Sequence, residues 1–106
     1  MSHERRRAER VKVNLDVRWE GHLERSKGTI SDISSNGCFV LSGGTVKPKE
    51  LIRLEIILPN DEPIHLWAEV VEEANEIGFA MQFTSAEPAE LARLEVFLKG
   101  CLAVES

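Results

Sequence analysis

Two short polar segments contain residues whose types and spacing suit the recognition of phosphates and base edges. Arg6, Arg7 and Arg10 lie close together near the N-terminus. A guanidinium is always charged, and its planar fork of donors can grip a phosphate or the O6/N7 edge of guanine. In an extended chain Arg6 and Arg10 are about 13 Å apart, which suits different parts of a dinucleotide. The segment predicts a basic arm that binds a compact anion.

The second segment is Asp32–Gly37, with the sequence Asp-Ile-Ser-Ser-Asn-Gly. Asp32 accepts hydrogen bonds when ionised and could bind the N1 and N2 donors of a guanine. Ser34 offers a rotatable hydroxyl, and Gly37 permits a positive φ or a close approach of a ligand to the backbone. Successive amides in such a turn can form an anion-binding concavity. Taken alone, the same pattern is typical of a tight turn in which Asp32 and Ser34 satisfy backbone amides.

Together the segments read Arg-Arg-x-x-Arg followed, about twenty-five residues later, by Asp-x-Ser-x-x-Gly. This pair resembles the signature of PilZ domains, which are bacterial receptors for the second messenger cyclic di-GMP. The segment Gly78–Phe83, followed by a terminal amphipathic helix, extends the resemblance over nearly the whole chain. No position of either motif departs from the family pattern.

The resemblance implies that the arm wraps the ligand against the second segment, which forms the rigid half of the site. Arg6 and Arg10 would bind guanine and phosphate, with Arg7 close by. Arg5 is an extra arginine that could favour a stacked pair of ligands over a single one. The implied cyclic di-GMP-binding residues are Arg5, Arg6, Arg7, Arg10, Asp32, Ser34 and Gly37.

The elements that must position these residues follow from the apolar pattern. Residues 11–20 alternate strictly between apolar and polar side chains, which predicts a half-buried strand. Further strands are expected at about 24–31, 37–41, 51–58, 64–71 and around 79–83. Six short strands with no helices between them predict an all-β fold, an antiparallel six-stranded β-barrel of the PilZ-like kind. A three- and four-residue spacing then predicts a C-terminal helix over about 88–102, with an apolar stripe across an open end of the barrel.

Length and composition limit the domain organisation. A chain of 106 residues holds one domain, and we expect a flexible basic arm over 1–10 and the barrel with its helix over 11–106. We find no apolar run long enough to span a membrane and no signal peptide, so a cytoplasmic protein without membrane insertion is expected. Two cysteines, Cys38 and Cys101, are too few for a disulfide scaffold, and both are expected to be buried. Trp19 and Trp67 are expected to be packing residues, although either could border the ligand cleft.

Charge is distributed unevenly along the chain. Residues 1–12 have five basic and two acidic side chains, a local charge of +3, which leaves −8 for the rest of a chain whose formal net charge is −5. An acidic body repels long polyanions, so nucleic-acid polymers are disfavoured as partners. A concentrated basic arm suits one compact anion better.

The sequence favours a receptor over an enzyme. Ser34 has no histidine nearby in sequence to activate it, no paired carboxylates stand out, and the three histidines are scattered, so neither a catalytic site nor a metal or other cofactor is expected. We expect the arm to become ordered around the ligand and to change the surface offered to an unidentified effector protein.

Two alternatives remain open. One is a PilZ-like adapter that has lost nucleotide binding, and the other is a small barrel that binds single-stranded nucleic acid through its basic arm. The sequence leaves open the number of ligands per chain, the formation of a homodimer, the affinity, and the pathway, whether motility, exopolysaccharide synthesis or virulence.

Overall fold

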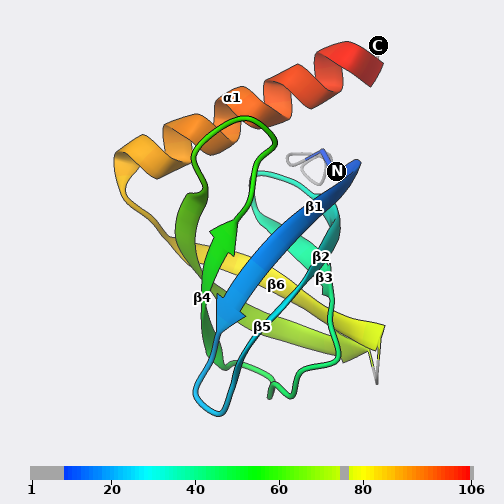
Figure 1. The fold of residues 1–106 in the computed structure, drawn as a ribbon, viewed down its shortest axis with the longest axis vertical. Helices are drawn as coiled ribbons and strands as arrows, with labels where there is room; N and C mark the ends of the chain where they lie inside the picture. The colour runs from blue at the N-terminus through cyan, green and yellow to red at the C-terminus, as the bar shows by residue number, and fades with distance from the viewer. Residues whose placement is uncertain (1–8, 75–76, 106) are drawn as a thin grey trace, which may run out of the picture.

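The computed structural model describes residues 9–74 and 77–105, so Arg5, Arg6 and Arg7 lie outside the described residues. Six strands are followed by one helix (Figure 1). Their bounds are β1 (Val11–Glu20), β2 (Arg25–Ile33), β3 (Gly37–Leu41), β4 (Leu51–Ile56), β5 (Ile64–Ala74), β6 (Gly78–Ser85) and α1 (Pro88–Glu105). The strands pair antiparallel in the order β1-β2-β3-β6-β5-β4 and close into a barrel. The predicted six-stranded antiparallel barrel with a C-terminal helix is confirmed.

Alternation along the strands produces the core. In β1, Val11, Leu15, Val17 and Trp19 face inward and are buried, because successive side chains of a strand point to opposite faces. Trp19 meets Phe79 of β6 edge-on, with ring centroids 5.3 Å apart. Trp67 does not fit the prediction that it packs in the core. It lies on the outer face of β5 with 44% of its surface exposed.

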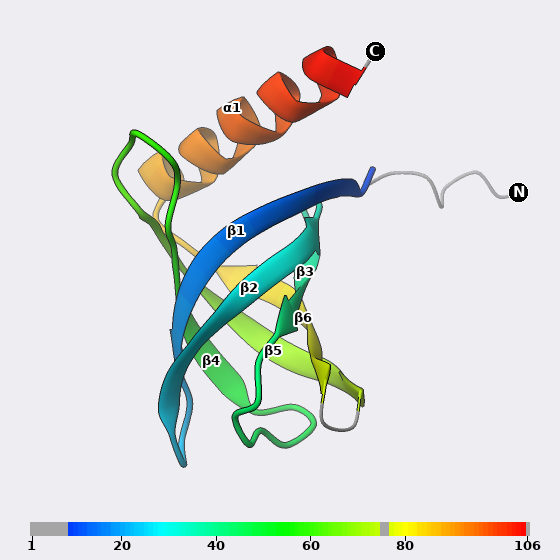
Figure 2. The same cartoon turned by 45° about the vertical axis from the view of Figure 1, so that its right-hand side comes forward.

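Closure of the barrel is uneven along β1. Only Val17–Glu20 pair with β4, whereas the whole strand runs beside β2. The first residues of β1 therefore lie at an end of the barrel where β1 and β4 are not paired. Helix α1 crosses the barrel at that end, above the beginning of β1 (Figures 1 and 2). The chain therefore enters β1 at the end that the helix covers, beside the β2–β3 turn.

The apolar stripe of α1 was predicted to pack across an open end of the barrel, and part of it is buried there. Leu94 and Leu98 are buried in the core, but Leu91 is 43% exposed, so the stripe is narrower than predicted. Cys101 is half-buried rather than buried, whereas Cys38 is fully buried. Within the described part of the chain, no helix has the length and apolar character needed to cross a membrane.

Candidate functional site

A local irregularity places Asp32 on the surface of the barrel. The β2–β3 register shifts between Ile30 and Asp32, and the β1–β2 register shifts between Lys12 and Leu15. Because an extra residue breaks the two-residue period, Ile30 and Ile33 both face the core while Asp32 between them points outward. The prediction that Asp32 belongs to a turn is therefore wrong in detail: Asp32 is the penultimate residue of strand β2, which ends at Ile33, and the turn begins at Ser34.

Arg10 forms an ion pair with this carboxylate. Its Nη2 lies 3.1 Å from Oδ1 of Asp32, and the two side chains are 51% and 29% exposed. Oδ1 is shielded from solvent and receives no hydrogen bond from any described donor. The contact is thus a charge contact without good hydrogen-bond geometry, and the carboxylate keeps capacity to accept hydrogen bonds from a ligand.

Ser34 locks the β2–β3 turn from inside. The amides of Asn36 and Gly37 donate to the Ser34 hydroxyl oxygen at 3.1 and 3.3 Å, and the Ser34 amide donates to the Gly37 carbonyl at 2.9 Å. The Phe83 amide of β6 donates to the Asn36 carbonyl at 2.7 Å, which fixes the turn to the neighbouring strand. Since Ser34 is only 1% exposed, its described contacts are those of a positioning residue. Direct contact between Ser34 and a ligand stays a prediction.

Gly37 is required by the close approach of two strands. A Cβ atom at this position would lie 2.1 Å from the carbonyl oxygen of Met81 in β6. No described glycine has a positive φ, so the first of the two reasons offered for Gly37 does not apply, and a close approach of the ligand to its backbone stays a prediction. The residue brings β3 against β6 and so holds the turn in place.

A row of outward side chains continues from Asp32 across five strands. Register pairs place Lys12 of β1 opposite Asp32, Asp32 opposite Phe39, Phe39 opposite Ala80, and Ala80 opposite Glu72. Opposite residues on neighbouring strands share one face of the sheet. Phe39 is half-buried and offers an aromatic surface beside the carboxylate, which a purine base can stack on. Sequence reasoning missed Phe39 as a candidate binding residue. The available signal was the alternation of the strand, because Cys38 and Val40 face the core and Phe39 between them must face outward.

Cys38 lies beneath this surface. Burial and, to a smaller extent, the negative charge of Asp32 raise the pKa of its thiol from 9.0 to about 12, and Arg10 opposes the shift. The thiol is therefore protonated at neutral pH and is a core residue, not a nucleophile.

The structure brings four of the seven predicted binding residues together. Arg10, Asp32, Ser34 and Gly37 meet where β1 begins beside the β2–β3 turn, the end from which the chain leads back toward Arg5, Arg6 and Arg7. Among residues 9–74 and 77–105, no three His, Cys, Asp or Glu side chains group into a set that could hold a metal ion.

The sequence matches the PilZ domain family model over residues 4–100. The chain belongs to the PilZ family. Both motifs lie inside the matched region, and the barrel with its terminal helix is the architecture that this membership requires.

Solved structures share this fold. The inhibitor of motility MotI/DgrA of Bacillus subtilis superposes with a TM-score of 0.74 at 21% identity, covering 95% of this chain and 51% of the other. MrkH, described as a c-di-GMP-dependent transcription regulatory factor, gives 0.72 at 21% identity, covering 94% and 52%. The PilZ domain of CeSA from a cellulose-synthesizing bacterium gives 0.67 at 15% identity, covering 92% and 99%.

These likenesses show the fold alone, because all three identities are low. This chain spans about half the length of the MotI/DgrA and MrkH chains. Comparison with curated protein sequences gave no match.

Proposed function

We propose that this PilZ domain is a receptor for cyclic di-GMP, which binds between the N-terminal arginines and the outer surface around Asp32. The observation that supports the proposal most strongly is the Arg10–Asp32 pair, which sets an arginine fork beside a carboxylate that is 29% exposed. A guanine presents donors at N1 and N2 to such a carboxylate, and its O6/N7 edge suits an arginine. Asp32 and Arg10 can therefore read two edges of one base.

Ser34 and Gly37 contribute rigidity in this proposal. Their turn is hydrogen-bonded internally and tied to β6, so it loses little conformational entropy when a ligand arrives. Phe39 supplies a stacking surface, and Arg5, Arg6 and Arg7 supply phosphate contacts from the arm.

Ordering of the arm is the proposed signal. Micromolar affinity requires about 8 kcal/mol, and several charged hydrogen bonds of about 1.5–3 kcal/mol each supply the gross attraction. Ordering the arm costs about 2–5 kcal/mol of this. The ligand then converts residues 1–10 into a fixed surface that an effector protein reads.

The family and the description of MrkH as c-di-GMP-dependent support a receptor or adaptor role for this chain. On the same grounds we propose that it acts in the cytoplasm and catalyses no reaction. The effector and the number of ligands per chain are left to measurement.

Isothermal titration calorimetry with cyclic di-GMP tests the proposal. We expect saturable binding by the wild type and a loss of about a hundredfold in affinity for Arg10→Ala and for Asp32→Ala, because each removes a charged partner. Arg25→Ala is the matched control, since Arg25 lies in β2 far from the motif residues, and its affinity should equal that of the wild type.

Other outcomes identify the alternatives. Wild-type silence up to high micromolar ligand overturns the proposal and supports an adapter that works through protein contacts alone. Retention of single-stranded oligonucleotides with steep salt dependence, and no preference for guanine dinucleotides, supports a nucleic-acid-binding barrel instead.

A further inference from the structure

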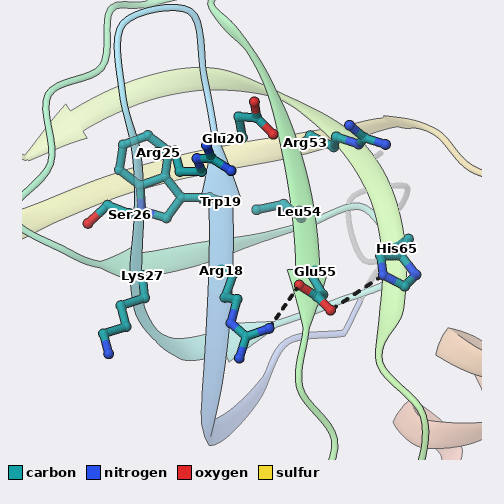
Figure 3. A pocket seen from close by; sticks show the side chains of 10 residues that line it. All are labelled: Arg18, Trp19, Glu20, Arg25, Ser26, Lys27, Arg53, Leu54, Glu55 and His65. Atoms are coloured by element: carbon teal, nitrogen blue, oxygen red, sulfur yellow. Dashed lines mark hydrogen bonds and ion pairs between the residues drawn. The ribbon is translucent and has the colours of Figure 1, made fainter.

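A second concave surface lies on the outside of the barrel, away from the motif residues. It is a cleft of about 660 Å³ formed by β1, β2, β4 and the beginning of β5 (Figure 3). Lys12, the register partner of Asp32, precedes Arg18 of the cleft by six residues, or about 20 Å along β1. The cleft is therefore separate from the proposed nucleotide site.

The cleft is rich in cations although the body of the protein is acidic. Arg18, Arg25, Lys27 and Arg53 line it, and among its described lining residues the only carboxylates are Glu20 and Glu55, which leaves an excess of positive charge even with His65 neutral. The chain beyond residue 12 has a net charge of −8. A local cationic surface on an acidic body suits a short acidic segment better than a long polyanion.

Most of these cations lack a carboxylate partner. Glu55 is shared between Arg18, at 3.4 Å, and His65, at 3.6 Å (Figure 3). Among the side chains that the structure describes, Arg25, Lys27 and Arg53 form no ion pair. The Arg53 guanidinium carbon instead lies 5.8 Å from the centre of the Trp67 ring. These donors are free to bind an anion from outside.

The spacing of the cations matches an extended peptide. Arg18 lies opposite Lys27 and Glu55 in one cross-strand row, and Glu20 lies opposite Arg25 and Arg53 in the next row, so each row has two cations and one carboxylate. The rows are two residues apart along the strands, or about 7 Å, which is also the distance between alternate side chains of an extended chain.

An aromatic side chain borders the cationic rows. Trp67 is the register partner of Arg53 and is 44% exposed. It lies in a neighbouring hollow of about 610 Å³ that shares Arg53 and His65 with the cleft. Tryptophan and arginine side chains are the residues that most often anchor protein interfaces.

We propose that this cleft docks an extended acidic segment of a protein partner, with carboxylates on the cationic rows and one apolar side chain on Trp67. The receptor then has two separate binding surfaces. The arm and Asp32 bind the nucleotide, and the β1–β2–β4 face binds the protein partner.

Fluorescence anisotropy with a labelled six-residue peptide, alternating Glu and Ser with one central Ser replaced by Leu, tests the proposal. The full chain should bind it, and the double variant Lys27→Glu/Arg53→Glu should bind at least about tenfold more weakly, because two attractive contacts become repulsive. Lys99→Glu makes the same kind of charge change on the exposed side of α1 and should leave the affinity unchanged. A peptide with Lys in place of Glu should not bind.

The arm is the competing cationic surface, so a triple variant Arg6→Ala/Arg7→Ala/Arg10→Ala is measured in parallel. We expect it to bind the peptide as the wild type does. Loss of peptide binding in this variant, with the cleft variant unaffected, overturns the proposal. So does the absence of peptide binding by the wild type. A thymidine oligonucleotide that binds more tightly than the peptide and depends on Lys27 and Arg53 also overturns it and identifies a nucleic-acid surface.

Discussion

The two polar surfaces of this barrel are constructed in opposite ways. Around Asp32, strand irregularities and a turn closed by Ser34 hold a few groups in fixed positions. In the cleft, Arg18, Lys27 and Arg53 project from regular strands and are exposed. The first surface is preorganised by its backbone, and the second is only a pattern of charges on a sheet. Preorganisation suits a small rigid ligand, whereas an adaptable charged surface suits a peptide.

Gly37→Ala should produce the largest effect. Its new Cβ would meet the Met81 carbonyl oxygen at 2.1 Å, so two strand backbones must separate. We expect a loss of about 3 kcal/mol in the free energy of unfolding, measured by urea denaturation. Gly43→Ala is the matched control, because nothing lies within 4 Å of the Cβ it adds, and it should be close to neutral. Equal stability of the two variants contradicts a tightly held turn.

Ser34→Ala should come next. Removal of the hydroxyl leaves the buried Gly37 amide and the Asn36 amide without their acceptor, at a cost of about 2 kcal/mol. The control Ser85→Ala removes an exposed hydroxyl from β6 and should change stability by less than about 0.5 kcal/mol. Thermal unfolding of both variants checks the difference, and an unchanged melting temperature for Ser34→Ala would mean that the turn holds without it.

Cys38 should make the motif region sensitive to alkaline pH. The folded pKa of about 12 exceeds the ordinary 9.0, so the folded state keeps a proton that the unfolded state loses. The associated stability is fully present below pH 9 and should fall by about 1.4 kcal/mol per pH unit between the two values. The free energy of unfolding is measured against pH for the wild type and for Cys38→Ala. The difference between the two curves isolates the contribution of Cys38 from that of the lysines, which titrate in the same range. Identical profiles for the two proteins would contradict a buried neutral thiol.

Substitution in the cleft should have the smallest effect on stability. Lys27→Glu and Arg53→Glu change exposed side chains that form no described ion pair, so each should alter the free energy of unfolding by less than about 0.5 kcal/mol. Urea denaturation measures both. A large loss in either variant would show that the cleft is a structural charge network and would remove the contrast between the two surfaces.

Much of the fold could be predicted because residues 11–20 alternate without interruption and because closure of six short antiparallel strands removes exposed sheet edges. Residues 11–20 and 37–41 were predicted with the bounds observed for β1 and β3. The end of β2 was not predicted correctly, because the extra residue before Asp32 breaks the alternation on which the prediction depended. Strand bulges are set by neighbouring strands, which a local pattern does not contain.

The same limit applies to the site. The motifs indicated Arg10, Asp32, Ser34 and Gly37, and the structure brings these together. Phe39 and the cleft depend on cross-strand register, which pairs residues distant in sequence such as Arg18 and Glu55. The exposure of Trp67 is different, because the alternation of residues 64–70 already places Trp67 on the polar face of its strand, with His65 and Glu69.

A backbone amide NMR titration with cyclic di-GMP tests the central claim most directly, because it reports on both surfaces in one experiment. We predict that the amides of Arg10, Asp32 and Gly37 shift with saturation, while those of Arg18 and Arg53 stay in place. Shifts confined to the cleft, or no shifts at all, would contradict the account.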